Sequence, residues 1–383
     1  MKKFAKMSLV AALAVAGTAA SAQPLAEAIK NVDVSGTVVY RYDDRDRDDN
    51  AADTSLNNYK IGLTAKSKVN DDVTAVTRFL VAGADGGFAA NGLNYTNDGD
   101  ANPSVTLNQV YFSYTGIANT TVNVGKQGLT TPWTVAVDAD SNEQNGTGIL
   151  ALTNVGPVTL AGAYFNQHNL DDSGAGTALL NGDENIITVG AMANIGPVAL
   201  DGWYLDMQDT FDSFTIGAAA NFDFDAVKLS LGARHTDLDL DGSSDDNELT
   251  KVEAGLKAGI FGANVGYGWT DNDGGLAALD ADAKSGFQGW TLDLNGKADA
   301  DLLKLNVNAQ VLPSLNLALN YNILDQDAAE DTKDTELYLQ ATYKMSKNFG
   351  GYIRFGQADL EDEAVDGDDV DRTIGRLQVQ YSF

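Results

Sequence analysis

The C-terminal stretch TIGRLQVQYSF (373–383) alternates strictly between two kinds of side chain. One set is apolar or aromatic, apart from a glycine: Gly375, Leu377, Val379, Tyr381 and Phe383. The other set is mostly polar: Ile374, Arg376, Gln378, Gln380 and Ser382. Because successive side chains of a β-strand point to opposite faces, this period of two predicts a strand with one apolar and one polar face.

The same alternation occurs along the rest of the chain, for example in DLLKLNVNAQV (301–311) and in 315–323. Segments of about ten residues with this alternation, separated by turns, are typical of a transmembrane β-barrel. A soluble β-sandwich also alternates, so the lengths of the connections must distinguish the two folds.

Short and long connections take turns along the chain. The short ones are 67–71, 115–119, 154–157, 194–197, 260–262, 311–314 and 345–348. The long ones are acidic and lie at 44–56, 83–104, 128–146, 168–183, 237–247, 272–299, 326–334 and 359–372. A barrel with short periplasmic turns and long external loops has this order, whereas a sandwich has no reason for it. The sequence therefore predicts an all-β, transmembrane, antiparallel β-barrel.

The number of strands follows from a parity argument, because bacterial barrels normally have an even number. Counting the alternating segment GFQGWTLDL (286–294) as a strand gives an odd total, so we assign it to a long external loop. About 18 strands remain. Sixteen is the alternative, because the segments 145–154 and 213–223 alternate more weakly.

Residues 1–22 have the features of a secretory signal peptide: three lysines, an apolar run and the small residues Ala20-Ser21-Ala22. Residues 23–383 then form a single barrel domain. Cleavage removes three of the 25 basic residues and none of the 54 acidic ones, leaving a formal charge of −32. Such an acidic chain is not expected to bind nucleic acid.

The polar faces of the strands are expected to line the lumen. They place these charged residues inside: Arg41, Lys60, Arg78, Lys228, Arg234, Lys251, Glu253, Lys304, Glu336, Lys344, Arg354 and Arg376. A barrel of 16 to 18 strands is too wide to be filled by side chains and leaves an aqueous channel. The sequence thus predicts passage of water-soluble molecules.

Two segments carry a family resemblance: PLAEAIKNVDVSGTVVYRYDD (24–44) and the terminal QYSF. Together they resemble the Campylobacter-type major outer membrane protein (porin) family. The resemblance implies an 18-stranded, homotrimeric, general-diffusion porin in the outer membrane of a Gram-negative bacterium, surrounded by lipid and lipopolysaccharide.

Resemblance to porins also implies an external third loop that folds into the barrel and narrows the channel. TVNVGKQ (121–127) is similar to the strand before that loop, which makes 128–147 the expected constriction loop. Its carboxylates Asp138, Asp140 and Glu143 would then face basic residues of the wall. The alternative is an ordinary exposed acidic loop.

The stretch DLDLDGSSDDNE (237–248) matches the pattern of a calcium-binding loop. Its candidate ligands are Asp237, Asp239, Asp241, the backbone of Ser243, and Glu248. The flanking residues alternate as strands and are not helical, so a plain acidic loop is the alternative. Divalent ions held by such loops could also bridge to anionic lipopolysaccharide.

The two histidines, His168 and His235, have no convergent partners that would indicate catalysis. We therefore predict no enzyme and no required cofactor, with Ca²⁺ as the one candidate ligand. The predicted function is passive diffusion of small hydrophilic solutes and ions, with a weak preference for cations because acidic loops enrich cations at the mouth. The alternatives are a substrate-specific channel, or a mainly structural or adhesive surface barrel.

Overall fold

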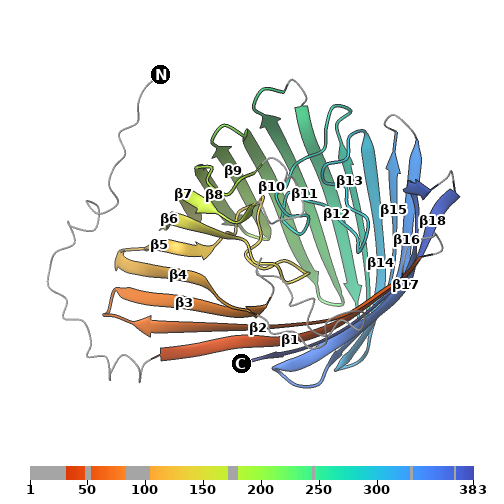
Figure 1. Ribbon diagram of the computed structural model, residues 1–383, viewed down its shortest axis with the longest axis horizontal. Helices are drawn as coiled ribbons and strands as arrows, with labels where there is room; N and C mark the ends of the chain where they lie inside the picture. The colour runs from red at the N-terminus through yellow and green to blue at the C-terminus, as the bar shows by residue number, and fades with distance from the viewer. Residues whose placement is uncertain are drawn as a thin grey trace.

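A computed structural model describes residues 32–47, 53–82, 104–170, 180–243, 246–327, 331–365 and 368–383. These residues form a closed ring of eighteen antiparallel strands (Figure 1). Both weakly alternating segments, 145–154 and 213–223, are strands, so the prediction of 18 is confirmed. The predicted signal peptide lies outside the described residues, and no helix among those described is long and apolar enough to cross a membrane.

The strands follow one another around the ring in chain order. They are β1 (Val32–Arg47), β2 (Thr54–Lys68), β3 (Val73–Ala82), β4 (Ser104–Ile117), β5 (Thr120–Gly128), β6 (Asn145–Val155), β7 (Val158–His168), β8 (Ile186–Ile195), β9 (Val198–Met207), β10 (Phe211–Phe224), β11 (Val227–Leu240), β12 (Asp246–Ala258), β13 (Phe261–Thr270), β14 (Ala300–Leu312), β15 (Leu315–Gln326), β16 (Thr332–Lys344), β17 (Phe349–Val365) and β18 (Asp368–Ser382).

The ring closes between its first and last strands, which pair from Thr37–Ser382 to Arg47–Arg372. Beyond this pairing, Phe383 and Gly36 exchange two backbone hydrogen bonds of 3.0 Å each. Closure satisfies the backbone groups of β1 and β18 that would otherwise form free sheet edges. The terminal strand that opened the sequence argument is therefore also the strand that completes the barrel.

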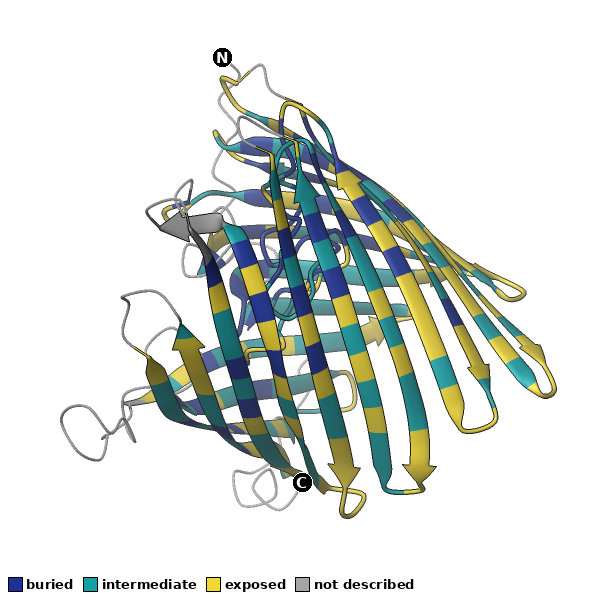
Figure 2. Ribbon diagram, turned by 90° about the vertical axis from the view of Figure 1, so that its right-hand side faces the viewer, coloured by how far each residue is buried: buried dark blue, intermediate teal, exposed yellow. Residues whose placement is uncertain are grey.

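Alternation in the sequence becomes alternation of burial along each strand, as the colour bands of Figure 2 show. On β14, for example, Leu305 and Val307 point outward and are 39% and 55% exposed. Lys304 and Asn306 lie on the opposite, inner face of the same strand. Large apolar side chains are exposed on the outside of the ring, as expected for a surface that faces lipid.

Tight turns join the strands at one end of the barrel. The repeated NVGP and NIGP segments each place a glycine, Gly156 or Gly196, at a φ of 59°. This left-handed conformation favours glycine because it has no side chain to clash with the backbone. The sequence did not identify two short connections, 225–226 at this end and 208–210 at the other.

Several strands at the long-loop end are longer than predicted. The predicted loop 359–372 is mostly strand, since β17 reaches Val365 and β18 begins at Asp368. The predicted loop 237–247 likewise shortens to the residues between Leu240 and Asp246. The apolar alternation ends earlier than the strands do because backbone pairing continues through polar residues beyond the apolar belt.

Two long connections turn into the ring and do not extend outward (Figure 1). We call residues 129–144, between β5 and β6, the first inward loop, and residues 271–299, between β13 and β14, the second inward loop. The first loop buries Leu129 and Trp133 against inner-wall residues such as Phe211 and Leu238. The second buries an equivalent cluster: Phe287, Leu292 and Leu294 against Leu249, Leu302, Leu324 and Leu360. The hydrophobic core therefore lies between the loops and the inner wall.

Candidate functional site

The base of the first inward loop is held by Trp133, whose side chain is fully buried. Its indole nitrogen donates a hydrogen bond of 2.8 Å to the hydroxyl of Ser213 on β10. The loop also closes on itself, because the Leu129 amide donates to the carbonyl of Gln144 at 2.9 Å. Apolar packing and two buried hydrogen bonds thus fix where the loop leaves the wall.

Glu143 attaches the same loop to the opposite part of the wall. Its carboxylate is buried and forms ion pairs with Lys60 of β2 at 2.8 Å and Arg78 of β3 at 2.6 Å. Asn108 of β4 donates a further hydrogen bond of 2.6 Å. Since all the charge of Glu143 is used in this cluster, its role in the structure is to anchor the loop.

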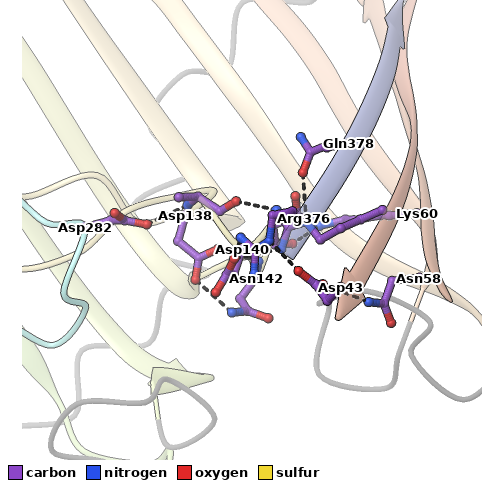
Figure 3. A network of polar contacts seen from close by, with 12 residues as sticks. Asp43, Asn58, Lys60, Asp138, Asp140, Asn142, Asp282, Arg376 and Gln378 are labelled. Atoms are coloured by element: carbon purple, nitrogen blue, oxygen red, sulfur yellow. Dashed lines mark hydrogen bonds and ion pairs between the residues drawn. The ribbon is translucent and has the colours of Figure 1, made fainter. Parts of the chain in front are cut away.

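Asp140 lies at the tip of the loop and contacts both strands that close the barrel (Figure 3). One of its oxygens accepts hydrogen bonds of 2.7 Å from Arg41 on β1 and from Arg376 on β18. Arg376 also pairs with Asp43 at 2.5 Å. Although Asp140 lies inside the ring, its side chain is 57% exposed, so water reaches the interior at this point.

Asp138 caps the loop tip rather than facing an arginine. It accepts bonds from the amide and side chain of Asn142 at 2.7 and 2.8 Å, and burial raises its pKa. For Asp140, partial removal from bulk water inside the ring also disfavours the charged form, but Arg376 and Arg41 outweigh this effect and lower its pKa. The pKa values of these two neighbouring carboxylates are therefore shifted in opposite directions.

The second inward loop packs directly on the first. The amide of Leu279 donates to the carbonyl of Trp133 at 2.9 Å, and the amide of Ser285 donates to the carbonyl of Pro132 at 2.8 Å. Asp282 accepts a bond of 2.6 Å from the Ala139 amide, next to the tip carboxylates. The two loops thus form one body inside the barrel.

Glu336 of β16 attaches the second loop to the wall. Its buried carboxylate accepts hydrogen bonds from the amides of Trp290 and Thr291 at 2.6 and 2.7 Å, and from Asn322 at 2.5 Å. The guanidinium of Arg354 lies 4.7 Å from the Trp290 ring, a cation–π contact. A charged group on the wall therefore orients an aromatic residue of the loop.

Two carboxyl groups of the second inward loop have strongly raised pKa values. Burial, with help from Asp138 and Asp282, raises the pKa of Asp280 to about 7. Burial also raises the pKa of Asp293 to about 6. The charge of this loop therefore changes between acidic and neutral pH.

All ten basic residues predicted to face the lumen lie on the inner faces of their strands, but they fall into three groups. Arg41, Lys60, Arg78 and Arg376 surround the first inward loop. Lys251, Lys304 and Arg354 contact the second. Arg234 pairs with Asp201 at 2.7 Å, Lys228 pairs with Asp223 at 2.8 Å, and Lys344 lies exposed at the end of β16.

The calcium candidates lie on the outer side of the barrel. Asp237 and Asp239 belong to β11, whose intervening Leu238 is buried in the interior cluster, so the two carboxylates point outward. Asp237 pairs in register with Glu248 of β12, while Asp241 and Ser243 lie in the turn beyond β11. Two strands therefore carry most of the predicted loop.

Two of the predicted ligands converge here with a histidine outside the predicted set. One ligand atom each from His235, Asp237 and Glu248 lies within 4.8 Å of the others. Nδ1 of His235 is already bonded to Thr250 at 2.8 Å. Calcium binding by the predicted residues stays a prediction.

The sequence analysis did not predict that the second inward loop belongs to the site. The site residues of this loop are Asp280, Asp282, Trp290 and Asp293. One signal was present, namely the alternating apolar residues of 286–294, which were assigned to an external loop. Alternating apolar residues that do not form a wall strand are still expected to be buried. In this protein they are buried inside the barrel, against the inner wall.

The comparisons with known proteins agree with this architecture. The profile of a family described as Campylobacter major outer membrane protein matches residues 1–383, the whole chain. The chain belongs to this family. Members of the Campylobacter major outer membrane protein family are outer-membrane proteins by description, which places this one in the outer membrane of a Gram-negative bacterium. No curated protein sequence matches it significantly.

Solved porin structures share the fold at low sequence identity. Pseudomonas aeruginosa OccK8 (OprE) is 14% identical with a TM-score of 0.73, over 92% of this chain and 98% of that one. A BenF-like porin from Pseudomonas fluorescens Pf-5 is 16% identical with a TM-score of 0.73, over 92% and 99%. P. aeruginosa OccK2 (OpdF), solved in complex with glucuronate, is 14% identical with a TM-score of 0.71, over 92% and 98%. Family and fold together support an outer-membrane channel.

Proposed function

We propose that this member of the Campylobacter major outer membrane protein family is a passive channel for small hydrophilic solutes and ions. The observation that carries the proposal is Asp140, a carboxylate inside the ring that contacts two arginines of the wall and is still 57% exposed. Charged, water-accessible groups at the tip of an inward loop are what a hydrated constriction requires.

We further propose that the channel weakly prefers cations. Asp138, Asp140 and the exposed Asp282 gather where the two inward loops meet, while Arg41 and Arg376 are each engaged by a carboxylate. The chain as a whole has 54 acidic and 25 basic residues, which favours cations at the mouth. The reversal potential across a planar bilayer under a KCl gradient tests this, and clear anion selectivity would contradict it.

A substrate-specific channel is the second candidate. The glucuronate complex of OccK2 shows that a barrel of the same fold can hold a small solute. Bilayer conductance and tracer flux separate the candidates, since a general channel gives linear flux and a specific one gives saturable flux. A mainly structural or adhesive barrel would conduct little in the same experiment.

We also propose a homotrimer embedded in lipid and lipopolysaccharide, with calcium as a ligand of the outer acidic segment around Asp237, Asp239, Asp241, Ser243 and Glu248. The mass of the detergent-solubilised native protein tests the trimer. Protease protection of residues 241–245 during a calcium titration tests the ion, and unchanged cleavage would argue for plain solvated charge. No other cofactor is required for passive diffusion.

A further inference from the structure

A pocket of about 480 Å³ opens into the lumen beneath the second inward loop. Its wall is formed by β11 to β16, and Gln288 and Gly289 of the loop cover it. Glu253 of β12 and Lys304 of β14 both line it. The pocket thus combines a carboxylate and an ammonium group in one lumen-facing hollow.

These two charged residues are in register with each other across one intervening strand. Glu253 pairs with Gly266 of β13, and Gly266 pairs with Lys304. Strands lie about 4.8 Å apart, so the two α-carbons are about 10 Å apart with a glycine between them. Both side chains project from the inner face toward the same space.

Glu253 and Lys304 remain unpaired within the part of the chain that the structure describes. Neither forms a hydrogen bond or ion pair there, and the contact of the Lys304 ammonium is with the ring of Phe287, 4.5 Å from its centroid. Other carboxylates of the inner wall, such as Glu336 and Asp201, are fully engaged. Two groups of opposite charge therefore lie near each other, and near Lys251, without a direct bond between them in the described structure.

Phe287 explains why the two charges do not pair with each other. Its ring sits on Gly266, where an added Cβ would lie only 2.9 Å from the ring. The aromatic edge therefore stands between Glu253 and Lys304. Both charged residues nevertheless line the same pocket.

The rest of the wall supplies neutral hydrogen-bonding groups. Asn264 donates to Asn306 at 3.0 Å, and Asn306 donates to Asn320 at 2.7 Å, forming a row of amides across three strands. Each amide carries two donors and an acceptor with two lone pairs, so the row has capacity for a ligand as well. Polar, uncharged parts of a solute are accommodated here.

From this geometry we infer that the pocket is a binding subsite for small zwitterions, of which free α-amino acids are the simplest class. The ligand's carboxylate bonds to Lys304 and its ammonium group bonds to Glu253, while the asparagine row contacts its polar side chain. Hydrogen bonds in which both partners are charged are stronger than neutral ones, so each end of the ligand would contribute to binding. The inference rests on the proposed channel, because the solute must reach the lumen.

The test uses tracer flux of L-glutamine into proteoliposomes that contain the full native oligomer. Glutamine has no net charge, so the membrane potential does not drive it. Two relatives of similar size isolate the requirement for both charges: N-acetyl-L-glutamine lacks the ammonium group and L-glutaminamide lacks the carboxylate. The variants are Glu253→Gln, Lys304→Met and the charge exchange Glu253→Lys with Lys304→Glu, and Lys347→Met in a short turn is the control.

We expect saturable flux for glutamine and linear flux for both relatives. Each single variant loses one charge-assisted bond, which raises the half-saturating concentration by about tenfold. The charge exchange restores saturation, since a zwitterion can bind in the opposite direction, and the control behaves as wild type. KCl conductance is measured on every sample. Loss of conductance in the wild type would overturn the proposed channel, whereas normal conductance with linear glutamine flux would overturn the subsite alone.

Discussion

We expect Asp140 to influence ions that pass the inward loops, because its carboxylate is exposed inside the ring. We predict that Asp140→Asn shifts the reversal potential toward anions, because Arg41 and Arg376 lose their shared carboxylate. One unit charge acting on an ion about 4 Å away is worth about 1 kcal/mol in water, which corresponds to a several-fold change in the cation-to-anion permeability ratio. Asp71→Asn, in the exposed turn between β2 and β3, is the matched control. An unchanged reversal potential would remove Asp140 from the ion path.

Two further carboxyl groups predict that the ion selectivity of the channel depends on pH. Asp280 and Asp293 titrate near 7 and 6, so lowering the pH from 8 to 5 removes two negative charges from the second inward loop. Cation preference should therefore fall over this range. Asp280→Asn should remove the upper part of the change, and Asp273→Asn, an exposed position of the same loop, should not.

The stability of the second inward loop should increase as the pH falls, whereas the cation preference decreases. Both carboxyl groups have folded pKa values above the ordinary value of 3.8, so their ionised forms oppose packing of the loop. Their contribution to stability is greatest near pH 4 and is lost as the pH rises through 6 and 7. Limited proteolysis within 271–299 should accordingly be faster at pH 8 than at pH 5, and the reverse order would contradict the assignment of burial as the cause.

At the scale of elements, Glu143 determines where the first inward loop lies. Glu143→Ala leaves Lys60 and Arg78 without their buried partner, and breaking a buried ion pair in this way costs about 3–5 kcal/mol. We expect the loop to detach from β2 and β3, which should increase single-channel conductance and current noise. Glu184→Ala, on another loop at the same end of the barrel, serves as control. Unchanged conductance would mean that Trp133 packing alone fixes the loop.

The sequence predicted the wall better than the contents of the barrel. Strict alternation, as at 373–383, indicates strands regardless of their neighbours, and parity correctly excluded 286–294 as a strand. The inward position of the second loop could not be read in this way, because Phe287 and Leu294 pack on Leu249 and Leu302 from distant strands. Inner-wall leucines at 238, 249 and 302 interrupt the polar face without indicating what covers them.

The carboxylates show a similar limit. The resemblance to porins predicted that Asp138, Asp140 and Glu143 would face basic residues as a set. Their environments differ because each depends on atoms from strands far away in sequence: Glu143 is buried among β2 to β4, and Asp140 reaches β1 and β18. Spacing in a sequence does not distinguish an anchoring carboxylate from an exposed one.

At the scale of the whole molecule, the last residue contributes to closure of the ring. Phe383 exchanges two backbone hydrogen bonds with Gly36, and its ring stacks on Tyr381 with centroids 5.7 Å apart. Deleting Phe383 leaves the Gly36 backbone groups unpaired at the junction of β1 and β18. We expect a lower yield of folded barrel, measured by the difference in gel mobility between heated and unheated samples. Phe222→Ala, near the short-turn end of β10, is the control.

The contact of Asp140 with both Arg41 and Arg376 has a consequence for how this channel can change over generations. The carboxylate that we propose to meet passing ions also links β1 and β18, the first and last strands of the ring. A substitution of Asp140 is therefore expected to affect assembly of the barrel as well as the selectivity of the channel. Selectivity should therefore drift more readily at positions such as Asp282, which contact the other loop and not the junction of the first and last strands.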